Sequence, residues 1–290
     1  MFNLTAVGEV RALLQRHGLK AQKKYGQNFL VDKNTLDKIV NAAQLEPTAQ
    51  VLEIGAGLGT LTVALAAVAQ RVVALEIDKR LAAPLAENLA GYSHIELIID
   101  DALKVNLNSF FTPELPRYVV ANLPYYIATP LLVALLELAP PPRRLVLLLQ
   151  KEVGERLTAA PGSKSYGSLG VLAQAYAKVE LAGEVPPTVF YPCPEVASCL
   201  VVLTPEEARA CQVVSRRTLE LTNRAIFGQR RKQLLKALLT SPHWQLDNPE
   251  EVALGLTELG IDPRQRGEEL EVREIVALAN RLHPCIRILQ

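Results

Sequence analysis

The chain has 290 residues, 49% of them hydrophobic, and a formal net charge of +1. This length favours a domain of about two hundred residues plus a smaller one, with enough apolar side chains for a packed core. Because the net charge is close to zero, nucleic-acid binding would require local clusters of basic residues. The four cysteines form no C-x-x-C pair, which argues against zinc and against a disulfide framework. No apolar run reaches membrane-spanning length, so we expect a soluble, cytoplasmic protein without a metal.

The first 32 residues are expected to form an N-terminal arm and a short segment that follows it. Lys23 and Lys24 precede an aromatic residue and then two amide side chains around a glycine, within residues 25–30. This pattern fits a solvated entry loop. It fits equally well a segment that closes over a cofactor and brings Asn28 and Leu30 against it.

A strand, a glycine turn and a helix follow one another between residues 51 and 60. The turn is Gly55-Ala56-Gly57-Leu58-Gly59, and glycines allow a backbone to approach a ligand closely. A dinucleotide fingerprint would have its third glycine at position 60, where this chain has threonine. Glu53 instead completes the E-x-G-x-G-x-G pattern of S-adenosylmethionine enzymes. That cofactor is a cation without a pyrophosphate, so a carboxylate beside it is acceptable.

Acidic residues follow the next two predicted strands. Glu76 ends the strand 71–75, about twenty residues after the glycines, where a carboxylate can bind both ribose hydroxyls. Asp78 is interpreted as a surface residue or a helix N-cap. After the strand 95–99, Asp101 rather than Asp100 is predicted to reach the adenine amino group of an adenosyl ligand.

The stretch Asn122-Leu123-Pro124-Tyr125 follows the apolar run 118–121 and is the predicted catalytic centre. Ligands of α/β sheets bind at the ends of such strands. An exocyclic base amine is a poor nucleophile, because its lone pair is delocalised into the ring. The Asn122 side-chain oxygen and the Leu123 carbonyl can accept its two hydrogens, Pro124 stiffens the turn, and Tyr125 offers a ring to a flipped base. The alternative is an ordinary strand-to-loop turn.

Two later loops are candidate substrate contacts. Residues 160–168 contain Lys164 and Tyr166 and form either a substrate-facing lid or a connection. Residues 186–194 form a proline-rich loop in which Phe190 and Tyr191 could stack on a base. The alternative for both aromatic side chains is packing into the core.

Strands end near residue 204, where we place a domain boundary. Residues 212–239 contain seven basic side chains and one acid. If the helix continues through Gly228, Arg217, Arg224 and Arg231 share one face at seven-residue spacing. Together with Arg230 and Lys232 they would bind RNA phosphates, although a solvated helix face is the common alternative. Lys23 and Lys24 are predicted to bind RNA phosphates as well.

The order and spacing of the motifs resemble those of the small-subunit ribosomal RNA adenine dimethyltransferases, the KsgA (RsmA) family. The likeness covers residues 20 to 285 and depends on the segments 24–30, 53–59, 75–78, 101–102, 122–125, 149–153, 185–194, 227–232 and 260–268. The chain departs from the family pattern at Tyr126, where Asn is usual, and at Tyr191 and Cys193.

The resemblance implies a Rossmann-like, seven-stranded α/β methyltransferase domain over 1–204 and a smaller all-helical RNA-binding domain over 205–290. It implies dimethylation of N6 on two adjacent adenosines in a hairpin near the 3′ end of 16S rRNA. S-adenosylmethionine would be the methyl donor. At the matching family positions, the donor would contact Asn28, Leu30, Gly55, Glu76, Asp101 and Asn122.

Other functions remain open at this stage. A large-subunit rRNA adenine methyltransferase shares the glycine turn and an Asn-x-Pro-aromatic site, but its C-terminal region is shorter. A non-catalytic ribosome-assembly or transcription factor could use the same fold. We expect a monomer whose partner is the small ribosomal subunit.

Overall fold

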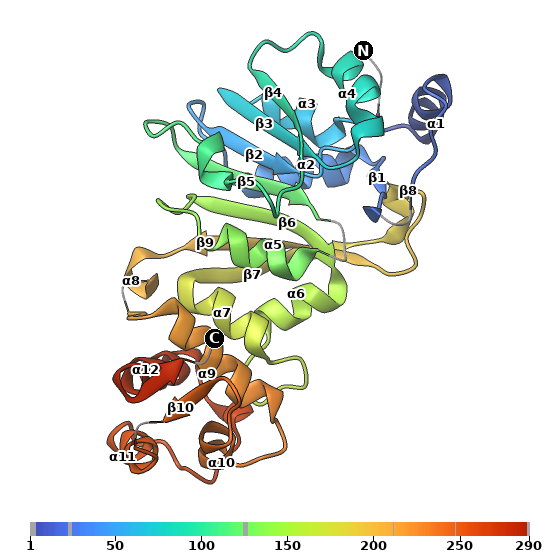
Figure 1. Cartoon of the computed structure of the whole chain (residues 1–290). Helices are drawn as coiled ribbons and strands as arrows, with labels where there is room; N and C mark the ends of the chain where they lie inside the picture. Colours follow the sequence, from blue (N-terminus) through green and yellow to red (C-terminus); the bar gives the residue numbers. More distant parts are fainter. Residues whose placement is uncertain (1–3, 23–24, 124–126, 211, 247, 289–290) are drawn as a thin grey trace. The chain divides into compact units, whose positions relative to one another are not determined.

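A computed structural model of the chain describes residues 4–22, 25–123, 127–210, 212–246 and 248–288 (Figure 1). It divides into two compact units, Met1–Gly154 with Glu180–Pro205, and Glu155–Val179 with Glu206–Gln290. The boundary expected at residue 204 lies next to the junction between Pro205 and Glu206. However, the sequence analysis left Glu155–Val179 with the first domain, whereas the structure groups this segment with the C-terminal helices.

The first unit is built on a seven-stranded sheet with the order β4-β3-β2-β5-β6-β9-β7. The strands β2 to β6 are parallel where they pair with one another, and β9 is antiparallel to β6. The bounds are β2 Gln50–Ile54, β3 Arg71–Glu76, β4 Ile95–Ile99, β5 Arg117–Asn122, β6 Arg144–Gln150, β7 Ala177–Val185 and β9 Ser198–Pro205. This sheet confirms the predicted fold class.

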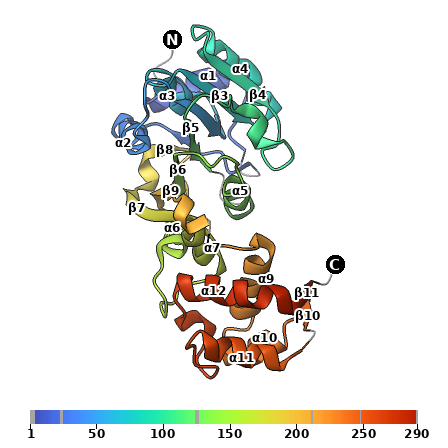
Figure 2. The same ribbon diagram turned by 90° about the vertical axis from the view of Figure 1, so that its left-hand side faces the viewer.

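Helices cover both faces of the sheet, as the continuous apolar strands require. On one face, Leu36 and Ile39 of α2 and Leu65 of α3 pack against strand residues that include Val72 and Val120. Helix α5 lies on the opposite face (Figure 2). The helices of this unit are α1 Val7–Arg16, α2 Lys33–Ala43, α3 Thr60–Ala66, α4 Ala82–Leu89 and α5 Ala128–Leu135, with 3-10 turns η2 Lys79–Leu81, η3 Leu107–Phe110 and η4 Pro187–Val189. Helix α6, Lys151–Thr158, crosses the junction between the two units at Gly154.

A small second sheet anchors the segment that precedes α2. Strand β1, Phe29–Leu30, pairs antiparallel with β8, Phe190–Tyr191, so that Leu30 is the partner of Phe190. Asp32 then caps α2 by accepting a hydrogen bond from the Thr35 N–H at 2.7 Å. The N-terminal segment is therefore fixed beside the proline-rich loop before the main sheet begins.

The second unit is mainly helical. Its elements are α7 Ser168–Tyr176, α8 Glu207–Ala210, α9 Arg216–Gly228, α10 Leu234–Leu239, α11 Glu250–Glu258 and α12 Val272–Leu282, with η5 Gly267–Glu269 and η6 His283–Cys285. The short antiparallel pair β10 Trp244–Leu246 and β11 Ile286–Ile288 was not predicted. No described helix has both the length and the apolar composition needed to span a membrane.

Tyr166 explains why Glu155–Val179 belongs to this unit. Its side chain is fully buried, its hydroxyl donates to the Leu270 carbonyl at 2.9 Å, and its ring meets Phe227 edge-on at 5.6 Å. The substrate-facing role suggested for Tyr166 is therefore wrong. A buried phenol hydroxyl needs a hydrogen-bond partner, and this one finds it in the C-terminal part of the chain, at Leu270 just before α12.

Candidate active site

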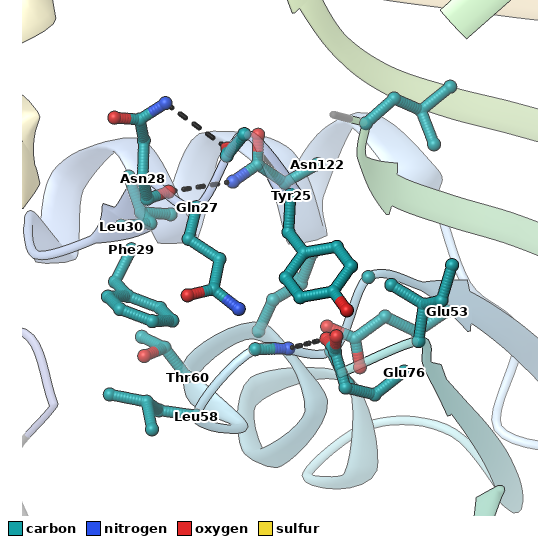
Figure 3. Close-up of a pocket in the computed structure, with 17 residues that line it drawn as sticks. Tyr25, Gln27, Asn28, Phe29, Leu30, Glu53, Leu58, Thr60, Glu76 and Asn122 are labelled. Atoms are coloured by element: carbon teal, nitrogen blue, oxygen red, sulfur yellow. Dashed lines mark hydrogen bonds between the residues drawn. The ribbon is translucent and has the colours of Figure 1, made fainter. Parts of the chain in front are cut away.

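A pocket opens at the carboxyl ends of the parallel strands (Figure 3). Three segments line it: the closing segment 25–30, the glycine turn with the start of α3, and the ends of β2, β3 and β5. Its described lining is Tyr25, Gly26, Gln27, Asn28, Phe29, Leu30, Glu53, Gly55, Ala56, Gly57, Leu58, Thr60, Leu61, Glu76, Ile77, Asn122 and Leu123. The structure thus brings Asn28, Leu30, Gly55, Glu76 and Asn122 together in one pocket, and their contact with S-adenosylmethionine stays a prediction.

The turn after β2 can form only with glycines at particular positions. Gly55, Gly57 and Gly59 all have positive φ angles, between 60° and 89°. At Gly57 a Cβ would lie 3.2 Å from the Phe29 ring, and at Gly59 it would lie 2.9 Å from Leu85 Cδ1. The glycines therefore serve two purposes: they adopt the left-handed conformation, and they leave room for the closing segment and α4.

Glu76 is held with its carboxylate facing the pocket. It is buried, and its two oxygens accept hydrogen bonds from the backbone N–H groups of Gly57 and Asp78, each at 2.8 Å. Burial raises the pKa of Glu76, while the N–H donors oppose that shift. A carboxylate has about four acceptor sites, so one remains on each oxygen for a ligand hydroxyl.

Of the two interpretations of Asp78, a surface residue or a helix N-cap, the first is wrong. Its side chain is only 3% exposed, although it does cap η2 by accepting from the Arg80 N–H. Gln27 Nε2 donates to Asp78 Oδ2 at 2.7 Å, and Gln27 Oε1 accepts from the Gln22 N–H at 2.8 Å. Gln27 therefore connects the closing segment to the end of β3. No local pattern predicts this role of Gln27, because its partner is 51 residues away.

Asn122 ends β5 with its amide already oriented. Its Nδ2 donates to the Asn28 carbonyl at 3.3 Å, which leaves Oδ1 as an acceptor (Figure 3). The next residue, Leu123, is buried, and its N–H is bound by the Leu148 carbonyl at 3.1 Å. Pro124, Tyr125 and Tyr126 lie outside the described residues.

Glu53 is the most deeply buried acid at the site. It is 1% exposed, and burial, with a smaller contribution from the neighbouring charge of Glu76, raises its pKa to about 8. Glu53 is therefore mostly protonated at neutral pH. In that form a carboxyl group can donate as well as accept a hydrogen bond.

Two other predicted site residues lie away from this pocket. Asp101 follows β4 but does not line the pocket; it accepts from the Leu103 N–H and pairs with Lys104 at 3.5 Å. Phe190 is 4% exposed and packs in the core with α2 and α3. A stacking role for Phe190 stays a prediction that requires its ring to become exposed.

The predicted RNA contacts lie in the second unit, except for Lys23 and Lys24, which are outside the described residues. Helix α9 ends at Gly228, because Gln229 leaves the helical conformation. Arg231 therefore lies beyond the helix, and the predicted face of three arginines is wrong. Arg217 and Arg224 remain on α9 with exposed side chains. The exposed Arg231 and Lys232 and the partly exposed Arg230 follow in the turn, where Arg230 pairs with Glu268 at 2.7 Å.

The pocket fits S-adenosylmethionine better than a dinucleotide. Its described lining contains no lysine or arginine to bind a pyrophosphate, and it contains the carboxyl groups of Glu53 and Glu76. Glu76 retains acceptor sites for two ribose hydroxyls, and the glycine turn leaves its backbone open to a close ligand. The fold and the site define an S-adenosylmethionine-dependent methyltransferase.

The particular kind of methyltransferase follows from comparison with known proteins. The chain belongs to the ribosomal RNA adenine dimethylase family, whose model matches residues 18–282. This membership confirms the family expected from the motifs, with S-adenosylmethionine as methyl donor and an rRNA adenine as acceptor.

Similar proteins carry the name "Ribosomal RNA small subunit methyltransferase A", and two of them show the extent of the match. One, from Geobacillus thermodenitrificans, is 41% identical over 290 residues, which covers 99% of both chains. The other, from Halothermothrix orenii, is 42% identical over 279 residues, covering 95% of this chain and 92% of that one.

Solved structures support the same fold. A dimethyladenosine transferase from Plasmodium falciparum has a TM-score of 0.76 at 26% identity and covers 89% of this chain and 98% of its own. The 23S rRNA methyltransferase ErmE has a TM-score of 0.65 at 27% identity and covers 88% of this chain and 99% of its own.

Proposed function

We propose that this protein transfers two methyl groups to N6 of each of two adjacent adenosines in a hairpin near the 3′ end of 16S rRNA. We further propose that it acts as a monomer in the cytoplasm, late in assembly of the small ribosomal subunit. The names of relatives that are 41% identical over nearly the whole chain support the choice of subunit. The observation that carries the chemistry is the fixed amide of Asn122 at the edge of the cofactor pocket.

In this proposal Asn28, Leu30, Gly55, Glu76, Asp101 and Asn122 hold S-adenosylmethionine. When bound, this cofactor supplies an electrophilic methyl group on a positively charged sulfur. The carboxylate of Glu76 binds the ribose hydroxyls through its two remaining acceptor sites. Asp101 would need to turn from Lys104 towards the adenine amino group.

Asn122 and the Leu123 carbonyl prepare the attacking nitrogen. Because the Asn28 carbonyl holds Nδ2, the Asn122 oxygen is the group that accepts a hydrogen from N6. Each such bond contributes about 0.5–1.5 kcal/mol net. Their larger effect is alignment of N6 with the methyl group, which can supply several kcal/mol of the barrier. A strong general base is not required, since the transferred methyl makes N6 acidic enough to lose its proton to water.

The target adenosine has to leave its stack, which costs a few kcal/mol. Tyr125 is proposed as one stacking surface for the flipped base. Phe190 is the second proposed surface, and its burial means that the proline-rich loop must shift to expose it. Lys23 and Lys24 together with Arg217, Arg224, Arg230, Arg231 and Lys232 are proposed to hold RNA phosphates.

The test is methyl transfer from labelled S-adenosylmethionine to small ribosomal subunits that lack the modification, with large subunits and DNA in parallel. Nucleoside analysis after digestion should find N6,N6-dimethyladenosine only in small-subunit RNA. The same product in large subunits alone would favour methylation of 23S rRNA, the activity in the name of ErmE. No transfer to any acceptor, with cofactor binding intact, would favour a non-catalytic assembly or transcription factor.

The residue assignment is tested by Asn122→Ala. One lost hydrogen bond to Asn28 should weaken S-adenosylmethionine binding by no more than about tenfold, whereas most of the transfer activity should disappear. Asn41→Ala is the matched control, because Asn41 is exposed on α2 and does not line the pocket. Full activity of the Asn122 variant would refute the assignment.

A further inference from the structure

A second pocket is lined by the closing segment but by no residue of the glycine turn. Its volume is about 370 Å³, which is within the usual range for small-ligand sites. One wall is Ala21 with Gly26, Gln27 and Asn28, and the other is Gln150 with the segment 192–196. Gly26, Gln27 and Asn28 line both this pocket and the cofactor pocket, so the two sites adjoin along the closing segment.

The chemistry of the lining suits a nucleobase and not a phosphate. Among the described residues that line it there is no lysine or arginine, and its one charged side chain is Glu195, which is acidic. Phosphate oxygens would be repelled there. Pro192, Pro194 and the 46% exposed Val196 give an apolar surface for the flat face of a base.

Gln150 is the side chain with unused hydrogen-bonding capacity in this pocket. It ends β6 and is partly exposed, and no described residue makes a hydrogen bond to its side-chain amide. By contrast, Gln27 uses its amide on Asp78 and Gln22. A glutamine amide can bind adenine in a bidentate manner, accepting from N6 and donating to N7.

The position of Gln150 suits the nucleotide next to the reacting one. In the parallel pairing of β5 with β6, Asn122 is the partner of Leu148, and Gln150 lies two residues further along. Neighbouring strands are about 4.8 Å apart and rise about 3.3 Å per residue, so the Cα atoms of Asn122 and Gln150 are about 8 Å apart. Both side chains therefore belong to the same edge of the sheet.

We propose that Gln150 binds the adenine adjacent to the base that is being methylated. The inference rests on the proposed function, which supplies two adjacent adenosines. Beside the site of methyl transfer, the enzyme would then have a second site that recognises the neighbouring, unreacting adenine. A dimethylated N6 carries no hydrogen, so the Gln150 oxygen would lose its donor once that neighbour had been modified. Transfer to an adenosine is therefore slower when the neighbour that Gln150 binds is already dimethylated.

The test uses unmodified small subunits that carry either both adenines or one adenine with guanine in place of its neighbour. Guanine presents acceptors at both O6 and N7, so it offers no donor to the Gln150 side-chain oxygen and cannot form the bidentate contact. The unaltered enzyme should methylate the remaining adenine about 5- to 150-fold more slowly than in the natural pair, the usual discrimination by a bidentate contact.

The variants Gln150→Leu and Gln150→Glu should be slow on the natural pair and should lose little more with guanine. Gln70→Leu is the control, because Gln70 is exposed just before β3, at the end of the sheet opposite the pocket. Unchanged binding of S-adenosylmethionine shows that each variant is folded.

If the Gln150 variants discriminate against guanine as strongly as the unaltered enzyme, Gln150 does not read the neighbour. The same conclusion follows if the unaltered enzyme is indifferent to guanine. Absence of transfer to the natural pair would instead overturn the proposed function itself, and this inference with it.

Discussion

The hydrogen bond between Gln27 and Asp78 should contribute to the affinity for S-adenosylmethionine, because it holds the closing segment in place. Residues 25–30 form one wall of the pocket, and Gln27 is their side-chain connection to the end of β3. In Gln27→Leu the segment keeps its size and its apolar contacts but loses this connection. We expect the affinity for S-adenosylmethionine to fall while the fold stays intact.

The magnitude follows from the partners of Asp78. A hydrogen bond to a charged group contributes about 1.5–3 kcal/mol. The lower end applies here, because Gln27 is partly exposed and Asp78 keeps its contacts with Arg80. About 1.4 kcal/mol corresponds to a factor of ten in an equilibrium constant. The dissociation constant of S-adenosylmethionine should therefore rise about tenfold.

The assay is calorimetric titration with S-adenosylmethionine, combined with turnover at saturating cofactor and a denaturant unfolding curve. Turnover should recover at high cofactor concentration, because Gln27 does not touch the Asn122 amide. Gln70→Leu serves as the control. A dissociation constant within twofold of the unaltered protein would refute the reasoning. So would a loss of affinity that merely follows a general loss of stability.

Three further predictions concern stability and RNA binding. The pKa of Glu53 rises from 4.5 to about 8 on folding, so its stabilising effect is complete below pH 4.5 and is lost as the pH rises to 8. The unfolding free energy should therefore fall by up to about 1.4 kcal/mol per pH unit in this window, and Glu53→Gln should remove that fall in denaturant unfolding curves measured at several pH values. Gly59→Ala should lower the unfolding free energy by about 1–3 kcal/mol, because φ is +89° and the new Cβ would meet Leu85; an unchanged melting temperature would contradict this. Arg217→Ala and Arg224→Ala should each lower the slope of log affinity for RNA against log salt by about one; equal slopes would show that neither binds a phosphate.

Much of the first unit could be predicted from local sequence. The continuous apolar runs indicate strands covered on both faces, and Gly55, Gly57 and Gly59 indicate a turn with positive φ angles after β2. Glu76 and Asn122 each end a strand, and parallel strands end at one edge of their sheet. These features depend on residues that are close in sequence, so the motif order was enough to predict the pocket.

The tertiary structure decided which polar groups meet across long separations. Gln27 reaches Asp78, the Asn122 amide reaches the Asn28 carbonyl across 94 residues, and Tyr166 reaches Leu270 across 104. No local pattern encodes these pairings, because each depends on how separate elements pack. Burial likewise makes Glu53 a mostly protonated acid, although its sequence position resembles that of any acid beside a turn. The sequence determined which chemistry is present, and packing determined which group orients which.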